Sequence, residues 1–140
     1  MAREQSRNIV KKEGTSEEKS LLIARFMQAK KAQNILILDL RQVASFTDYF
    51  VICTGRSDRQ VQAIAEHLER ELKGLKWKPT AVEGLGVARW VLMDFGDVIV
   101  HIFQKQIREF YDLEGLWSDA PRLEFPEDTE SMDTEVEEDF

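Results

Sequence analysis

Residues 48–57, with the sequence DYFVICTGRS, constrain the fold most, because an apolar strand there leads through a glycine into a capped helix. Positions 49–53 are almost wholly apolar and rich in aromatic and β-branched side chains, which predicts a core strand. After Ser57 the apolar residues recur every three or four positions, which predicts one buried helical stripe. Ser57 and Gln60 have the spacing of a capping box, and Gly74 is a typical helix stop. The stripe consists of Val61, Ile64, Ala65, Leu68 and Leu72.

The rest of the pattern predicts an α/β domain: a mixed sheet of about five strands with helices packed on it. Thr15 and Glu18 form another capping box, so a first helix is expected to run to about Lys31. A last helix is expected from Gln104, with Ile107, Phe110 and Tyr111 on one side. The strands are expected at 35–39, 49–53, 80–83, 90–94 and 98–103, the last of these at the centre of the sheet.

Composition divides the chain into a leader (1–14), one domain (15–120) and an acidic tail (121–140) that is expected to be disordered. The net charge is −7, but residues 124–140 hold nine acidic residues and no basic ones. The remaining 123 residues carry 19 Lys and Arg against 17 Asp and Glu, so little direct nucleic-acid binding is expected. No apolar run could span a membrane and no secretory signal is visible, which predicts a cytoplasmic protein.

No pattern of catalytic or metal-binding residues emerges, so no enzyme activity and no cofactor are predicted. Cys53 is the only cysteine and lies in an apolar strand, which favours a buried structural thiol. His67 and His101 are too few for a histidine metal site, and a structural role is expected for His101. Asp94 and Asp97 are three residues apart across a turn, whereas two magnesium ligands on one strand face need a spacing of two. The Asp97 side chain is therefore expected to bond its own backbone.

Two alternatives involve small ligands. The chain could be a nucleotidyltransferase-like enzyme, for which Gly55, Ser57 and Asp58 offer partial support. It could instead be an anion-binding or nucleotide-binding module, because free amide hydrogens and the helix dipole meet at Gly55, Arg56 and Ser57. The competing interpretation is that Ser57 only caps its helix.

Surface recognition is the better supported function. Trp90, Leu92 and Asp94 alternate with Val91 and Met93 along one strand, so one face of the sheet is expected to be less covered than the other. An exposed tryptophan is a typical anchor for a protein partner, although the spacing alone leaves Trp90 equally compatible with a core position. Two further aromatic residues are expected either to extend such a surface or to hold the last helix down, namely Tyr111 and Trp117.

Several motifs in residues 16–120 resemble the ribosomal silencing factor family, also called Iojap. The matching segments are DYFVICTG (48–55), Trp90 with GDV (96–98) and VH (100–101), and LWSDA (116–120). The resemblance implies an α/β fold related to nucleotidyltransferases but without their catalytic carboxylates. The leader and the acidic tail lie outside the matching motifs.

The resemblance also implies a function. Members of this family bind the large ribosomal subunit through its interface protein number fourteen and block joining of the small subunit, which represses translation. A role in large-subunit biogenesis is also attributed to them. The tryptophan of the motif belongs to their contact surface and matches Trp90. The expected partner-binding residues are therefore Trp90, Leu92, Phe95 and Tyr111, and the sequence leaves open whether the chain forms a homodimer.

Overall fold

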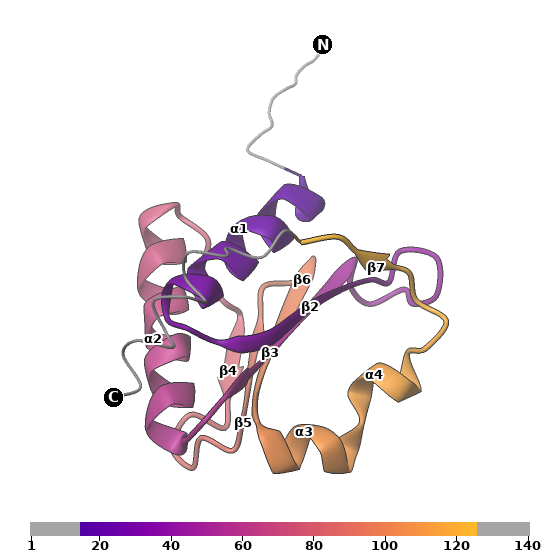
Figure 1. The fold of residues 1–140 in the computed structure, drawn as a ribbon. Coiled ribbons are helices and arrows are strands. Elements are labelled where there is room, and N and C mark those ends of the chain that lie inside the picture. Colours follow the sequence, from indigo (N-terminus) through magenta and orange to yellow (C-terminus); the bar gives the residue numbers. More distant parts are fainter. Residues whose placement is uncertain (1–14, 126–140) are drawn as a thin grey trace.

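The computed structural model describes residues 15–125 and contains one mixed sheet with helices on both faces (Figure 1). The strand order is β4-β5-β6-β3-β2-β7; β3 pairs with β6 in parallel, and the other neighbours are antiparallel. This confirms the predicted α/β class, with six strands in place of about five. In chain order the elements are α1 (Ser16–Ala29), β2 (Gln33–Asp39), β3 (Tyr49–Gly55), α2 (Asp58–Gly74), β4 (Ala81–Glu83), β5 (Trp90–Asp94), β6 (Val98–Gln104), α3 (Lys105–Tyr111), α4 (Leu113–Leu116) and β7 (Arg122–Leu123).

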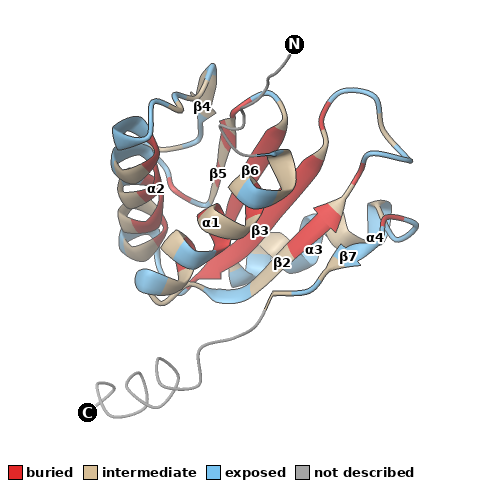
Figure 2. Cartoon of the chain, turned by 90° about the horizontal axis from the view of Figure 1, so that it is seen from above, coloured by how far each residue is buried: buried red, intermediate tan, exposed pale blue. Residues whose placement is uncertain are grey.

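The parallel pair β3 and β6 forms the centre of the sheet. Every residue of β3 is buried, and β6 is buried from Val98 to Phe103. Figure 2 shows both strands red along almost their whole length. Strands that are buried on both faces are apolar without alternation, which is why the segments 49–53 and 98–103 were recognisable from the sequence.

Helices α1 and α2 cover one face of the sheet, and their buried residues form the first core cluster with Ile37, Val51 and Val100. The predicted stripe of α2 is buried, and Figure 2 shows it as a red band facing the sheet. Ser57 caps α2 by accepting a hydrogen bond from the Gln60 N–H at 3.1 Å. The reciprocal half differs from a capping box, because Gln60 Oε1 accepts from the backbone of Arg56 and not from that of Ser57.

An ion pair holds the start of α1 against the turn between β5 and β6. Lys19 Nζ lies 2.8 Å from Asp97 Oδ1 and 4.8 Å from the centre of the Trp77 ring. The prediction that the Asp97 side chain bonds its own backbone is therefore wrong. Asp94 has that role, since its Oδ1 accepts from the Gly96 N–H at 2.8 Å. The turn is tied to the rest of the sheet through long-range contacts that residue spacing does not reveal.

The short helices α3 and α4 lie at the other face, where the second core cluster includes Leu38, Phe50 and Phe103. One side chain fastens both helices to the sheet. Arg108 donates to Asn34 O at 2.7 Å, to Thr54 Oγ1 at 2.8 Å and to Glu114 Oε2 at 2.9 Å. The Arg108 side chain is only 11% exposed, so these charge-assisted bonds are shielded from water.

The folded domain extends beyond the boundary at residue 120 that composition suggested. Strand β7 pairs with β2, matching Leu123 with Ile37, and Phe125 packs against the first core cluster. Residues 121–125 therefore do not belong to a disordered tail. The predicted leader and the rest of the predicted tail, residues 126–140, lie outside the described part. No helix within residues 15–125 is long and apolar enough to cross a membrane.

Two buried titratable groups are held in their uncharged forms. Burial raises the pKa of the Cys53 thiol to about 12, as expected of a structural cysteine. Burial also lowers the pKa of His101, which is 3% exposed on β6, to about 3. The imidazole is therefore neutral near pH 7 in the folded chain.

Replacing Arg108 with Met tests how α3 and α4 are fastened. The variant keeps an unbranched apolar stem but leaves the carboxylate of Glu114 without its cation, so we expect a loss of about 3 kcal/mol in the free energy of unfolding. Lys105→Met on the same helix is the matched control, because its ion pair with Glu109 is exposed and worth at most about 0.5 kcal/mol. Urea denaturation measures both, and equal losses would contradict the assigned role of Arg108.

The burial of His101 predicts a pH dependence of stability. The pKa of His101 is lower in the folded chain than in the unfolded chain. Between about pH 6.5 and pH 3 the unfolded chain therefore binds a proton at His101 that the folded chain does not bind. The free energy of unfolding falls as the pH is lowered through that window. The limiting slope is about 1.4 kcal/mol per pH unit. We expect wild type to lose at least about 1 kcal/mol more than His101→Gln between pH 6.5 and pH 5 in urea denaturation. Parallel pH profiles would contradict the assignment, and His67→Gln serves as the control for the other histidine.

Candidate protein-binding surface

Strand β5 is covered on one face and partly open on the other. Val91 and Met93 are fully buried in the first core cluster, whereas Trp90, Leu92 and Asp94 are only partly buried. This confirms the sequence-based expectation of one less covered face. Trp90 lies between the two positions left open for it, since the residue packs on the second core cluster and is only partly buried.

The indole of Trp90 is held in place by a hydrogen bond and by ring contacts. Its Nε1–H donates to His101 Nδ1 at 3.1 Å. Because Nδ1 of the neutral imidazole accepts this bond, the ring proton of His101 is on Nε2. The centre of the Trp90 ring system lies 4.8 Å from each of the ring centres of Phe103 and Tyr111. The predicted structural role of His101 is confirmed, and it includes orienting Trp90.

Helix α3 adds exposed aromatic area beside Trp90. Tyr111 is 53% exposed, and Phe110, in edge contact with it at 5.1 Å, is 79% exposed. The sequence grouped both with Ile107 on one helical side, but only Ile107 packs on the core cluster. Phe110 was therefore missed as a candidate partner-binding residue, because residue spacing alone does not show which residues of this helical side are exposed. We call Trp90, Leu92, Phe110 and Tyr111 the aromatic surface.

Phe95 does not belong to the aromatic surface. It is 9% exposed and packs in the first core cluster, which lies on the side of the sheet covered by α1 and α2. The expectation that Phe95 lies in the patch around Trp90 is wrong, because alternation along the chain places Phe95 on the same side as Val91 and Met93, which are buried in that cluster. The structure brings together three of the four predicted residues.

A hollow of about 260 Å³ adjoins Trp90 at the edge of the sheet and is lined by Glu83, Gly84, Trp90 and Leu92. Gly84 has a φ of +86°, and a Cβ at this position would overlap the carbonyl oxygen of Trp90. Only glycine fits both the left-handed backbone and the close approach. The chain that follows β4 therefore passes close to the start of β5 at Gly84. Because Gly84 has no side chain, it does not fill the hollow.

A second group of apolar side chains lies near α4. Phe46 is 56% exposed and Leu116 is 74% exposed. The Trp117 ring lies 5.9 Å from that of Phe46 and 6.0 Å from that of Phe50, between ring centres. Trp117 thus packs α4 against the sheet, which is one of the two roles considered for it, and it makes no ring contact with Trp90 in the described chain.

The structure gives little support to the other candidate sites, a metal site and an anion site at the start of α2. Within residues 15–125 no group of three His, Cys, Asp or Glu side chains could hold a metal ion. At the start of α2 the N–H groups of Arg56 and Gln60 are already bonded to neighbouring side chains, so fewer donors face an anion. A Cβ on Gly55 would come within 2.8 Å of Val61, so packing of α2 against β3 explains this glycine.

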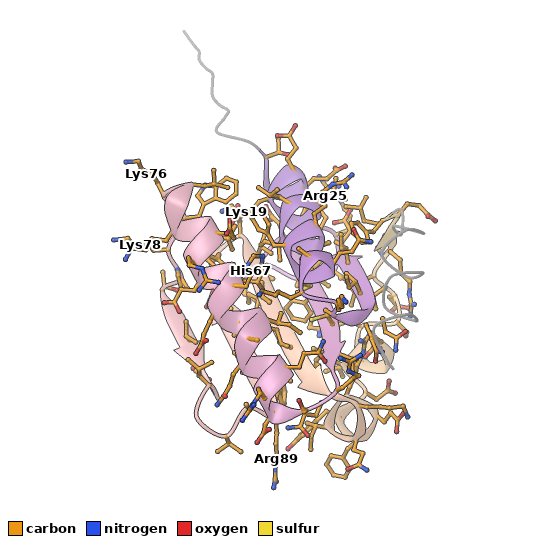
Figure 3. All side chains as sticks on the ribbon, turned by 60° about the vertical axis from the view of Figure 1, so that its left-hand side comes forward. Lys19, Arg25, His67, Lys76, Lys78 and Arg89 are labelled. Atoms are coloured by element: carbon orange, nitrogen blue, oxygen red, sulfur yellow. The ribbon has the colours of Figure 1, made fainter. Side chains whose placement is uncertain are left out.

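His67 and the surface lysines near it lie on the opposite face from the aromatic surface. His67 is on α2 where it faces α1, in edge contact with Phe26 at 5.9 Å between ring centres (Figure 3). Partial burial lowers the pKa of His67. Lys76 and Lys78 project outward beyond the end of α2.

Comparisons with known proteins agree with the resemblance in the motifs. The model of a family described as "Ribosomal silencing factor during starvation" matches residues 13–139, which extends past the motifs into the acidic end of the chain. A ribosomal silencing factor of Bacillus subtilis is 48% identical over 92 residues, or 66% of this chain and 78% of that protein. The mouse protein "Mitochondrial assembly of ribosomal large subunit protein 1" is 30% identical over 100 residues, or 69% of this chain and 44% of that protein.

Two solved structures share the fold. A crystal structure of a Chromobacterium violaceum protein superposes with a TM-score of 0.73 at 32% identity, covering 80% of this chain and 92% of that one. A Bacillus halodurans structure gives a TM-score of 0.68 at 38% identity, covering 77% and 99%. The family model spans the sheet, its helices and the segment that carries Trp90, and on this ground, with the similar relatives and structures, the chain belongs to the ribosomal silencing factor family.

Proposed function

We propose that this chain binds the large ribosomal subunit through interface protein number fourteen, using the aromatic surface, and thereby blocks joining of the small subunit. The observation that carries the proposal is a partly exposed tryptophan, fixed by a hydrogen bond to a buried histidine, on a sheet face that its own helices cover only in part. Family membership supports a role in ribosomal silencing, and the mouse relative is named for assembly of the ribosomal large subunit.

The geometry suits an anchor residue. Aromatic side chains dominate binding hot spots because they bury a large rigid area at a small cost in conformational entropy. In this chain the Trp90 ring is already immobilised by His101, Phe103 and Tyr111, so little further ordering is required on binding. Leu92 and Phe110 extend the apolar area around it.

The proposed mechanism is steric occlusion without turnover. A domain seated on the face of the large subunit that meets the small subunit would occupy the space that the small subunit requires. No chemical step is needed for this mechanism. In the family's biogenesis role, the same binding event would act on the large subunit before joining.

Charge introduced into the aromatic surface should weaken binding strongly. We expect Trp90→Glu to weaken binding to purified large subunits by about 2 kcal/mol or more, which is more than tenfold. Tyr111→Glu should also weaken it, and because that side chain is 53% exposed the substitution should be tolerated by the fold. Co-sedimentation with separated subunits measures both variants, and joining is scored in the same gradients.

Leu75→Glu is the matched control for these substitutions. Leu75 is 46% exposed at the end of α2, which packs on the other face of the sheet, so the same charge there should leave binding unchanged. Circular dichroism and urea denaturation establish that each variant is folded. Folded Trp90→Glu and Tyr111→Glu proteins that bind as tightly as Leu75→Glu would place the interface elsewhere.

Occlusion also predicts the stoichiometry of inhibition. Because each blocked subunit must keep its bound factor, the fraction of large subunits unable to join should equal the fraction occupied at every protein concentration. A titration of subunit joining against bound protein measures this relation. Inhibition of many subunits by one chain, or inhibition that persists after the chain is removed, would show a catalytic mechanism instead.

A further inference from the structure

We infer that the hollow beside Trp90 receives a cationic side chain, lysine or arginine, from the protein partner. This inference rests on the proposed function and specifies the chemistry at one edge of the same surface. The hollow combines one carboxylate, one indole, one leucine and a glycine without a side chain: Glu83, Trp90, Leu92 and Gly84.

Strand pairing places the lining residues on one face. Glu83 is directly opposite Leu92 in the antiparallel pair of β4 and β5, so the two side chains point to the same side of the sheet. Trp90 lies two residues before Leu92 and shares that side. The carboxylate of Glu83 thus belongs to the open face and stands at the rim of the aromatic surface.

Glu83 lacks a cation from its own chain. It is exposed, and within residues 15–125 no hydrogen bond or ion pair involves its side chain, in contrast to Asp39, Asp97 and Glu114. Lysine and arginine are absent from the lining of the hollow. Arg89, which directly precedes Trp90, projects away from the body of the domain (Figure 3).

A lysine or arginine would satisfy each part of this lining. Its charged end would pair with the Glu83 carboxylate, its cation would be attracted to the face of the Trp90 indole, and its apolar stem would cover Leu92. A phosphate group would meet the carboxylate and be repelled. The occupant is therefore a basic side chain of a protein, and ribosomal RNA is excluded from this part of the surface.

The test compares binding of Glu83 variants to purified large subunits by co-sedimentation at several salt concentrations. We expect Glu83→Gln, which keeps the shape and removes the charge, to weaken binding about threefold to tenfold and to make it less sensitive to salt. Glu83→Lys should weaken binding more than tenfold. Glu66→Lys, an exposed position on α2 at the other face, is the matched control and should bind like wild type.

The outcomes separate this inference from the proposed function. If Glu83→Gln and Glu83→Lys bind like Glu66→Lys while Trp90→Glu fails to bind, the cationic occupant is refuted and the aromatic surface stands. Tighter binding by Glu83→Lys would show that the hollow faces phosphate and would also refute the inference. If wild type binds neither subunit, the proposed function itself is wrong. If the Glu83→Lys protein misfolds, the Glu83→Gln protein still tests the cationic occupant, because glutamine has the same shape as glutamate.

Discussion

The parallel pairing of β3 with β6 is the constraint on which the rest of this structure depends. Both strands are buried on both faces, so the sheet cannot have one face in water along its centre. Helices α1 and α2 cover one face along the length of these strands. On the other face only the short helices α3 and α4 are available, and they leave the edge strand β4 and its neighbour β5 partly uncovered. The candidate binding surface combines the partly uncovered side of β5 with the exposed aromatic residues at the end of α3.

The contacts that stabilise the second face also prepare it for binding. Arg108 fastens α3 through backbone and side-chain acceptors on β2 and β3, and this places Tyr111 against the Trp90 ring. His101, kept neutral by burial, accepts the indole N–H and fixes the ring orientation. A surface that is ordered before its partner arrives loses less entropy on binding, which favours affinity. Folding and recognition therefore use the same few side chains.

Two errors in the sequence-based predictions, those on Asp97 and on strand β7, occurred where contacts are long-range. Phe95 was grouped with Trp90 because it follows β5, but alternation along the chain places it with Val91 and Met93 in the core on the other side. Asp97 was predicted to bond its own turn, yet Lys19 lies 78 residues earlier and captures its carboxylate. Strand β7 was assigned to the tail because a two-residue strand has no detectable pattern; only pairing with β2 defines it.

The sequence by itself determined the α/β class, the central strands, the stripe and cap of α2, and the family, because these depend on local periodicity and on motifs contiguous in the chain. It also showed that Trp90 and Leu92 share a strand face. Only the tertiary structure decided that this face is the less covered one and that Phe110 and Glu83 lie beside it. Coverage of a sheet depends on where short helices and edge strands are fastened, and side chains distant in sequence, Arg108 above all, decide that.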